Sequence, residues 1–359
     1  MRQVMKIAIA AATAATLSLA GCAGTPAASP APTTTTGGAT SEAPAPEAKI
    51  KVGMAFDVGG RGDQSFNDSA AAGLDKAASE FGVEAMDVAA VAGEAESART
   101  ERLQQLIDAG FTNIVAVGFA YANSVGEVAK ANPDVKFAIV DDASEASTGE
   151  NIMNIVFAEH EGSFLVGAAA AMKSKTGHIG FVGGVETDLI KKFQAGYEAG
   201  AKAVKADIKI DSTYLTQPPD FSGFGDPAKG KTAADGMFQA GADIVYHAAG
   251  GSGGGVFTAA KEAGGWAIGV DSDQALTAAE DVRSVILTSM LKRVDVGVYD
   301  FIKSVHDGAF QAGPKVFDLK ADGVGYSTTG GNVDDIKADL DALRDQIIAG
   351  SIVVPDTVS

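Results

Sequence analysis

The fold is decided by residues 56–67, which read Phe56-Asp57-Val58-Gly59-Gly60-Arg61-Gly62-Asp63-Gln64-Ser65-Phe66-Asn67. An apolar run, Lys51 to Phe56, precedes the loop and is of the kind that forms a buried parallel strand. The glycines that follow let the backbone turn sharply, because they tolerate positive φ angles. In open α/β sheets small ligands bind beyond the carboxyl ends of the strands. We therefore predict a ligand-binding loop here, with Asp57 at the end of its strand.

The residues after this loop are expected to begin a helix. Ser65 or Asn67 is expected to cap that helix and leave free N–H groups facing the ligand crevice. Phe66 has two interpretations, because an aromatic side chain at a helix start either packs in the core or lies beside a bound ligand. The local sequence does not separate these two roles.

Short apolar segments alternate with amphipathic segments along most of the chain. We predict strands near residues 52–56, 84–88, 114–117 and 137–140, with helices near 67–81, 95–109 and 122–131 between them. After a connection at 152–157 the alternation restarts, with helices near 161–173, 189–204, 228–240 and 256–263 and strands near 179–182, 208–214, 244–247 and 267–270. An apolar run at 284–289, a helix at 294–305, a strand near 315–319 and a last helix at 333–349 follow. This order is typical of parallel βαβ units with right-handed crossovers.

The length of this alternating region predicts two lobes, because about 310 residues exceed what one hydrophobic core supports. We predict an α/β fold with two doubly wound parallel-sheet lobes joined by crossover segments. The first lobe is expected to hold residues 50–157 and about 284–310, and the second residues 158–283 and about 311–359.

The N-terminus carries the pattern of a bacterial lipoprotein signal. Two basic residues precede an apolar segment from Ile7 to Leu19, which is too short to span a membrane as a mature helix, and Leu19-Ala20-Gly21-Cys22 follows. This lipobox predicts removal of residues 1–21 and a lipid on Cys22; the alternative is an ordinary secretory signal with an incidental cysteine. Residues 22–49 are rich in Ala, Pro, Thr, Ser and Gly and predict a disordered tether. We therefore expect a lipid-anchored protein at the extracytoplasmic face of the cell membrane.

The composition argues against a disulfide within the chain and against nucleic acid as a partner. Cys22 is the single cysteine, so no disulfide can form within the chain. The formal net charge of −18 argues against nucleic acid as a partner, because binding to it needs a basic surface.

Polar or glycine-rich loops follow several of the predicted strands. They are Val140-Asp141-Asp142, Gly183-Gly184, the glycine cluster 250–255 and Val270-Asp271-Ser272-Asp273. Acceptor groups at several strand ends suit the hydroxyl and N–H groups of a neutral ligand better than an anion. Lys292 is expected to open a helix, where it is either solvated or held by carboxylates of a pocket.

A serine hydrolase is the alternative from another class. Gly250-Gly251-Ser252-Gly253-Gly254 matches the G-x-S-x-G pattern, and Asp271 or Asp300 and His306 follow in the required order. A glycine-rich loop that lets backbone N–H groups approach a ligand explains the same residues. A phosphate-binding loop is excluded because 59–62 lacks the Gly-Lys-Ser/Thr ending. The histidines are scattered and Asp271-x-Asp273 lacks the rest of a calcium loop, so no metal or cofactor is expected.

Four segments together resemble the basic membrane protein family of substrate-binding lipoproteins, which includes nucleoside receptors of ABC importers. The segments are Asp57-x-Gly-Gly…Asp63-x-Ser-Phe-Asn67, Val140-Asp141, Gly269-Val270-Asp271-x-Asp-Gln274 and Thr288-Ser-Met-Leu-Lys-Arg-Val-Asp295. The resemblance runs from about Ile50 to Ser359. It implies a type I periplasmic-binding-protein fold whose two lobes close on a ligand, no enzymatic activity, and delivery of the ligand to a permease and its ATPase subunits.

The same resemblance implies roles for eight residues, with a purine nucleoside as the expected cargo. Asp57 and Asn67 would bond the edge of the base, and Phe66 would stack on its face. Asp141, Asp271 and Lys292 would hold the ribose hydroxyls, and Gly250 would allow close backbone approach. The second stacking aromatic is Phe221 or Phe224; we favour Phe224, which lies directly before Gly225-Asp226-Pro227. A sugar or another polyhydroxylated ligand, bound for uptake or for signalling, is the alternative cargo, and a monomer is expected.

Overall fold

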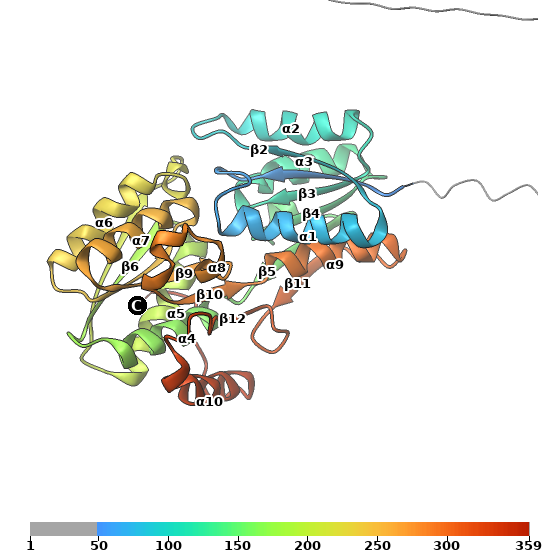
Figure 1. Ribbon diagram of the computed structural model, residues 1–359. Helices are drawn as coiled ribbons and strands as arrows, with labels where there is room; N and C mark the ends of the chain where they lie inside the picture. The colour runs from blue at the N-terminus through green and yellow to red at the C-terminus, as the bar shows by residue number, and fades with distance from the viewer. Residues whose placement is uncertain (1–48, 359) are drawn as a thin grey trace, which may run out of the picture. The chain divides into compact units, whose positions relative to one another are not determined.

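The computed structural model describes residues 49–358 of the protein. Within them the chain forms two α/β lobes, each built on a sheet of six strands (Figure 1). The strand orders are β11-β5-β4-β3-β1-β2 and β12-β10-β9-β8-β6-β7, so the second lobe repeats the order of the first. The predicted α/β fold of two doubly wound lobes is confirmed. The predicted signal and lipidation site and nearly all of the predicted tether lie outside the described residues.

The first lobe places its six strands between helices on both faces. Helices α1 and α9 pack together, as do α2 and α3. Its elements are β1 (Lys51–Phe56), α1 (Phe66–Phe81), β2 (Glu84–Ala89), α2 (Glu96–Asp108), β3 (Asn113–Val117), α3 (Ala122–Ala131), β4 (Lys136–Val140), β5 (Ile152–Phe157), α9 (Val294–His306) and β11 (Gly313–Phe317). All of its strand pairs are parallel.

The second lobe has the same layering, with α4 packed on α5 and α6 packed on α7. Its strands pair in parallel except for the short β12, which runs antiparallel to β10. Its elements are α4 (Glu159–Lys173), β6 (His178–Val185), α5 (Asp188–Val204), β7 (Lys209–Thr216), α6 (Pro227–Gln239), β8 (Ile244–Ala248), α7 (Gly253–Ala263), β9 (Trp266–Asp271), α8 (Gln274–Thr277), β10 (Ile286–Lys292), β12 (Val324–Tyr326) and α10 (Lys337–Ile348).

The chain crosses between the lobes three times, after β5, after β10 and after β11. The crossings are hydrogen-bonded to one another: Ala158 N–H donates to the Phe317 carbonyl at 3.0 Å, and Arg293 N–H donates to the Gly323 carbonyl at 2.8 Å. These bonds tie the crossing segments together, an arrangement that suits a hinge motion between the two lobes.

The predicted boundaries of the lobes need correction near the C-terminus. Strand β10 was expected in the first lobe but pairs with β9 of the second. Residues 313–317 were expected in the second lobe but form β11, which pairs with β5 of the first. The predictions failed because a strand's partner depends on the crossover connections, which local periodicity does not report. The sequence also showed no sign of β12 or α8, because both are shorter than a periodic pattern needs.

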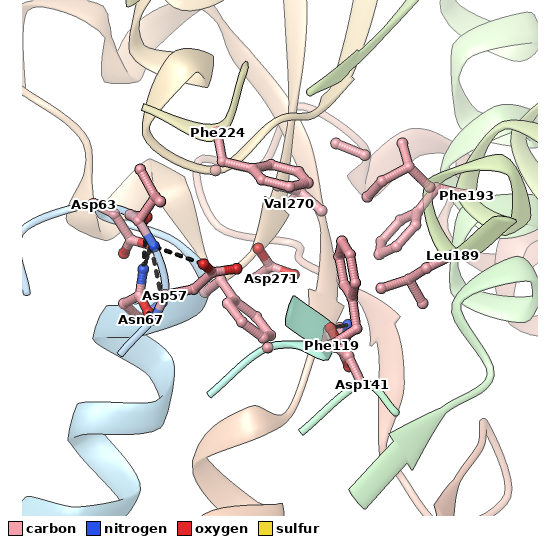
Figure 2. A pocket seen from close by; sticks show the side chains of 17 residues that line it. Asp57, Asp63, Asn67, Phe119, Asp141, Leu189, Phe193, Phe224, Val270 and Asp271 are labelled. Carbon is pink, nitrogen blue, oxygen red and sulfur yellow. Dashed lines mark hydrogen bonds and ion pairs between the residues drawn. The ribbon is translucent and has the colours of Figure 1, made fainter. Parts of the chain in front are cut away.

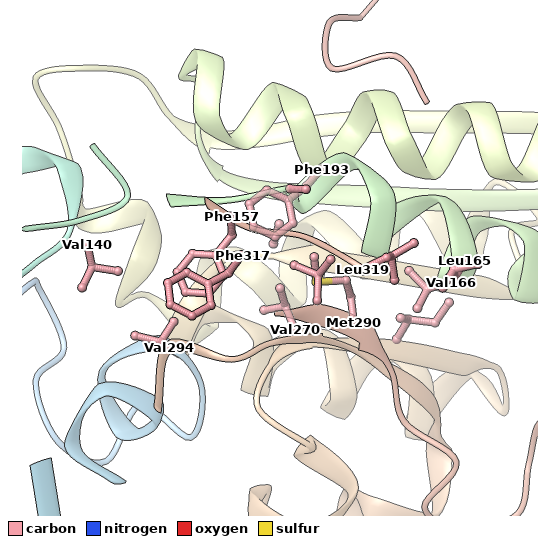
Figure 3. Close-up of a cluster of buried hydrophobic side chains, with 14 of the residues drawn as sticks. Val140, Phe157, Leu165, Val166, Phe193, Val270, Met290, Val294, Phe317 and Leu319 are labelled. Carbon is pink, nitrogen blue, oxygen red and sulfur yellow. The ribbon is translucent and has the colours of Figure 1, made fainter. Parts of the chain in front are cut away.

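The hydrophobic core continues from one lobe to the other through the hinge. Phe157, Val294 and Phe317 lie where the crossings begin, and Val270, Met290 and Leu319 extend the cluster into the second lobe (Figure 3). Separate clusters fill the outer face of each lobe. None of the helices among residues 49–358 is long and apolar enough to cross a bilayer.

Candidate ligand-binding site

A cavity lies where the carboxyl ends of the strands of both lobes meet (Figure 2). Its lining surrounds about 550 Å³ of space not occupied by atoms, a volume that includes open solvent. The structure brings all eight residues of the predicted site to this cavity: Asp57, Phe66, Asn67, Asp141, Phe224, Gly250, Asp271 and Lys292. They come from six different loops or strand ends.

The first loop is held in shape by its own side chains. Both carboxylate oxygens of Asp63 accept backbone N–H groups at the start of α1, from Ser65, Asn67 and Asp68 at 2.8–3.1 Å. Asp63 is therefore the cap of this helix; the prediction of Ser65 or Asn67 was wrong, because Ser65 makes no capping bond and Asn67 already lies inside the helix. The amide of Asn67 donates to Asp63 at 3.0 Å and accepts from Asp57 N–H at 3.1 Å. Asn67 thus fixes the position of Asp57.

Asp57 presents one free carboxylate oxygen to the cavity. Its Oδ1 accepts from Val58 N–H at 2.8 Å, and its Oδ2 accepts no hydrogen bond from the described residues. Gly118, with φ +108°, allows this placement, since a Cβ there would lie 2.8 Å from Asp57 Oδ2. Burial raises the pKa of Asp57 to about 6, against the opposing effects of the Val58 N–H and the Arg99 charge. Asp57 is therefore largely ionised at pH 7 and acts as an acceptor.

Asp141 and Asp271 occupy equivalent positions in the two lobes. Asp141 directly follows β4 and Asp271 ends β9, and both adopt left-handed backbone conformations with φ of 69° and 62°. Burial raises the pKa of each to about 6, and the charge of Lys292 acts in the opposite direction on both. Asp141 Oδ1 is buried without a hydrogen-bond partner among the described residues. Asp271 Oδ2 accepts from the Ser65 hydroxyl at 2.6 Å, so it also joins the two lobes.

Lys292 is the cation of the site. The sequence suggested that it opens a helix, but it is the last residue of β10 and is 1% exposed. Its Nζ lies 2.5 Å from Asp141 Oδ2 and 3.2 Å from Glu159 Oε1. Burial alone lowers the pKa of Lys292, but the carboxylates of Asp141, Glu159 and Asp271 outweigh it and hold the pKa above its ordinary value. The ammonium group therefore stays charged and is held by two carboxylates.

Aromatic rings line the apolar part of the cavity. Phe66 contributes to the lining, and its ring lies 5.2 Å from Lys292 Nζ. Phe224 lines the cavity and makes an edge contact with Phe119 at 6.5 Å between ring centres. Phe221, the alternative to Phe224, is not part of the lining and lies instead against Arg99, 5.5 Å from its guanidinium carbon. Gly250, at φ +53°, leaves room for Phe224, because a Cβ there would be 3.1 Å from the Phe224 carbonyl.

The two lobes are in direct contact beside the cavity. The Gln64 carbonyl accepts from the Gln274 amide at 3.0 Å and from the Thr277 hydroxyl at 3.1 Å, and the Ser65 carbonyl accepts from the Ser272 hydroxyl at 2.9 Å. Together with the Ser65–Asp271 bond, these contacts describe lobes closed on each other. The loop predicted to bind ligand is therefore also the part of the first lobe that meets the second.

Sequence reasoning missed several residues of the site. Phe119, Leu189, Ile190 and Phe193 line the cavity, and Glu159 lies beneath it, 1% exposed. Phe119 directly follows the glycine after a predicted strand, the position that identified the other site residues, so that signal was available. Phe193 and Leu189 lie on a long amphipathic helix, α5, where the sequence does not distinguish a side chain facing a cavity from one in the core.

The structure does not assemble the hydrolase. The Ser252 hydroxyl donates to the Gly223 carbonyl at 2.7 Å and accepts from Asp226 N–H at 2.7 Å, so it anchors a loop. His306 lies on α9 of the first lobe, packed against Phe81, whereas Ser252 belongs to the second lobe. Among residues 49–358 no group of three or more histidine, cysteine or carboxylate side chains is placed to hold a metal ion.

Residues 50–358 match the family model Bmp, described as "ABC transporter substrate-binding protein PnrA-like". The chain belongs to the Bmp family. The fold and function class implied by the sequence resemblance are thus confirmed: this is a family of substrate-binding proteins with the type I periplasmic-binding-protein fold, and the hydrolase alternative finds no support in it.

Curated relatives and a solved structure are similar to this Bmp-family chain over most of its length. The "ABC transporter nucleoside-binding protein BmpA" of Lactococcus lactis subsp. cremoris is 35% identical over 321 residues, which cover 85% of this chain and 89% of that protein. A lipoprotein of Pyrococcus abyssi is 37% identical over 291 residues, 77% of this chain and 69% of its own. The crystal structure of an ABC transporter solute-binding protein from Aeropyrum pernix K1 superposes with a TM-score of 0.74 at 31% identity, covering 85% of this chain and 94% of that one.

Proposed function

We propose that this Bmp-family protein binds a ribonucleoside, a purine nucleoside in particular, and delivers it to an ABC permease from a lipid anchor on the extracytoplasmic face of the membrane. The observation that carries the proposal is the combination of three buried carboxylates, each with an oxygen that accepts no hydrogen bond from the described residues, around a cavity walled by phenylalanine rings. The name of the Lactococcus lactis relative supports the nucleoside, and that of the Pyrococcus abyssi relative supports the lipid anchor.

The ring of a nucleobase suits the apolar walls. Phe66 and Phe224 would lie against its faces, because flat π-systems gain both apolar contact and stacking from such neighbours. Asp57 Oδ2 would accept a hydrogen bond from the edge of the base, and Asn67, whose Oδ1 keeps one free lone pair, would assist at the same edge. An ionised acceptor at this edge can accept from N1–H of inosine and guanosine; in adenosine only the N6 amino group can donate there, because N1 is itself an acceptor.

The ribose suits the charged floor of the cavity. Asp141 Oδ1 and Asp271 would each accept a hydrogen bond from a ribose hydroxyl, and Lys292, which donates one hydrogen bond to Asp141, would donate another to a ribose oxygen. A carboxylate left unpaired in a closed site costs on the order of 1–3 kcal/mol or more. Ligands without the hydroxyls should therefore bind much more weakly than ribonucleosides.

A thermal-shift panel tests the cargo. The chain from Lys49 onward contains the whole compact unit of residues 48–359 apart from one residue and should be denatured and refolded to remove any ligand carried through purification. We expect inosine and guanosine to raise the melting temperature by several degrees, 2′-deoxyinosine less, and hypoxanthine or ribose alone hardly at all, since a ligand that binds the native state stabilises it by RT ln(1 + [L]/Kd).

Two variants make the panel specific. Asp271→Asn should weaken inosine binding, measured by titration calorimetry, whereas Asp281→Asn, which alters an exposed carboxylate paired with Lys261 on the surface, should not. A response to a sugar without any response to nucleosides would replace the proposed cargo by the polyhydroxylated alternative. Equal affinity for adenosine and adenine would contradict the roles given to Asp141 and Asp271.

The lipid anchor has its own test. Cys22→Ser in the full-length chain should abolish incorporation of labelled palmitate and release the protein from the membrane fraction, because Cys22 is the single cysteine and the last residue of the lipobox. Retention of the label in this variant would contradict the anchor without affecting the proposed cargo.

A further inference from the structure

Arg99 is a buried cation that lies outside the lining of the cavity. It lies on α2 of the first lobe and is 5% exposed. Its Nε has no hydrogen-bond partner among the described residues and lies 3.8 Å from Glu94 Oε1. The Glu94 carboxylate is already taken by Arg102, whose two terminal nitrogens donate to it at 2.9 and 2.5 Å. The charge of Arg99 is thus only partly compensated by Glu94, which is unfavourable for a buried guanidinium.

Two aromatic rings lie against this guanidinium, one from each lobe. Its carbon is 5.9 Å from the ring centre of Tyr121, which belongs to the first lobe, and 5.5 Å from that of Phe221, which belongs to the second. Phe221 also touches Phe119 of the first lobe edge-on, at 5.9 Å. A cation against an aromatic face is stabilised most when water is excluded. Arg99 therefore gains this second ring when the lobes meet.

The segment that carries Phe221 is held in shape by the second lobe alone. The Thr216 hydroxyl donates to the Asp220 carbonyl at 2.6 Å, Ser222 N–H donates to Asp220 Oδ1 at 2.9 Å, and the Gln217 amide donates to Glu186 at 2.7 Å. Phe221 is therefore presented in place before it meets Arg99. A preorganised contact of this kind costs little ordering entropy on closure.

Arg99 also acts on the binding site electrostatically. Its charge favours the ionised form of Asp57, whereas Glu94 and Asp141 oppose it. Tyr121, which packs on Arg99, donates through its hydroxyl to the carbonyl of Phe56, the residue before Asp57, at 3.0 Å. Arg99, which contacts Phe221, thus also influences Asp57, the residue proposed to accept a hydrogen bond from the base.

We propose that Arg99 and Phe221 form a closing contact that retains the bound ligand, with Arg99 as the positioning residue. The inference rests on the proposed function for the identity of the ligand, but not for the contact itself. The closing contact gives a role to Phe221, the aromatic residue of the 217–224 segment that does not line the cavity.

Ligand kinetics test the contact. In stopped-flow measurements with inosine, Phe221→Leu should raise the dissociation rate about tenfold and change the association rate less than twofold, because the contact forms after the ligand enters. Arg99→Met should have a similar effect, and the double variant should be no worse than either single one, since both remove the same contact. Additive effects, or an unchanged dissociation rate in Phe221→Leu, would overturn the proposal.

A matched pair within one lobe is the control. Lys136 Nζ lies 5.2 Å from the ring of Phe310, and both residues belong to the first lobe. Phe310→Leu should leave both rates unchanged, although it removes the same kind of interaction.

The pH dependence of binding separates Arg99 from Phe221. Arg99→Met should raise the pH at which inosine affinity is lost, because the charge of Arg99 favours the ionised form of Asp57. Phe221→Leu should leave that pH unchanged, because Phe221 carries no charge.

The distance between the lobes decides the proposal even if inosine proves not to be the ligand. Spin labels at Lys130→Cys on α3 and Lys202→Cys on α5 place one probe on each lobe of a chain that otherwise lacks cysteine when it begins at Lys49. In the ligand-free protein, Phe221→Leu should lower the fraction with the short, closed distance, and Phe310→Leu should not. An unchanged distribution would overturn the closing contact, whereas failure of wild-type protein to bind any nucleoside would overturn only the proposed cargo.

Discussion

The two lobes share a strand order and differ in the loops that reach the cavity. Asp141 follows β4 in the first lobe and Asp271 ends β9 in the second, with the same left-handed backbone conformation. Gly118 after β3 and Gly250 after β8 form a second equivalent pair, both with positive φ. Each lobe thus supplies one aspartate acceptor and one glycine, at equivalent strand ends on opposite sides of the cavity.

The first βα loop breaks this equivalence. In the first lobe nine residues separate β1 from α1, and Asp63, Asn67 and Asp68 hold them in shape by hydrogen bonds. In the second lobe two residues separate β6 from α5, and Thr187 caps the helix directly. The first lobe therefore presents a polar edge through Asp57, and the second presents the apolar side chains Leu189, Ile190 and Phe193. Two sheets with the same strand order thus present a polar edge or an apolar wall to the cavity, depending on the length of one loop.

The largest effect is expected at Lys292 of the second lobe, whose ammonium group pairs with Asp141 of the first. Lys292→Met leaves Asp141 and Glu159 buried without their cation, and breaking a buried pair costs about 3–5 kcal/mol. The melting temperature in calorimetry should fall by several degrees or more at pH 7, and by less at pH 5, because Asp141, whose pKa burial raises to about 6, then takes up a proton. Lys303→Met removes a surface ion pair with Asp307 on α9 and should leave the melting temperature nearly unchanged. Equal shifts in the two variants would contradict a structural role for the buried cation.

Substitutions of the two equivalent aspartates, Asp141 and Asp271, should affect ligand binding alike but protein stability differently. Asp141→Asn and Asp271→Asn should each weaken inosine binding about 10- to 100-fold, because each removes the negative charge and replaces one acceptor oxygen by an NH2 donor. Only Asp141→Asn should also lower the melting temperature of the ligand-free protein, since Asp141 lies 2.5 Å from Lys292 whereas Asp271 accepts from the neutral Ser65 hydroxyl. Calorimetric titration and thermal melts of the two variants test this, and identical behaviour would show that the two strand ends are interchangeable.

The carboxylates should also make binding depend on pH. Burial raises the pKa of Asp57, Asp141 and Asp271 to about 6 in the closed protein, from 3.8. A raised acid pKa means that the folded state binds more protons between about pH 4 and 6, so these groups stabilise the closed, ligand-free protein at low pH and that contribution is lost as pH rises through 6. Ribose hydroxyls need the ionised forms, so inosine affinity should fall below about pH 6, up to roughly tenfold per pH unit for each proton taken up. Constant affinity from pH 7.5 to 5 would refute this account.

The smallest effect is expected at the paired glycines. Gly118→Ala should weaken inosine binding several-fold, because its Cβ would lie 2.8 Å from Asp57 Oδ2 and displace that acceptor. Gly250→Ala should do less, since its Cβ would lie 3.1 Å from a backbone carbonyl, at a φ of +53° that side chains tolerate better. Gly62→Ala is the control: it has a φ of +100° but nothing within 4 Å of the added atom, so it carries the backbone strain without the displacement. Similar losses of affinity in all three would assign the effect to strain alone.

The sequence by itself determined the fold class, nearly all of the long elements and the residues at the strand ends. It did so because strand and helix periodicities are local, and because acceptors and glycines directly after apolar runs mark the edge of a parallel sheet where ligands bind. The family resemblance added the full set of eight site residues, and all eight line one cavity. Phe224 was preferred over Phe221 from its neighbours in sequence, and the structure places Phe224 at the cavity.

Only the tertiary structure decided that β10 belongs to the second lobe and β11 to the first. It also decided that Asp63 caps α1 and that Lys292 ends a strand, where its ammonium group lies between two carboxylates. It alone revealed Glu159 beneath the site and Arg99 facing a ring of the other lobe. The pairs Lys292–Asp141, Lys292–Glu159 and Arg99–Phe221 join residues more than 100 positions apart, and the crossovers that bring them together depend on which strand pairs with which. Local patterns carry no information about that pairing, so the contacts that join the two lobes cannot be read from either one alone.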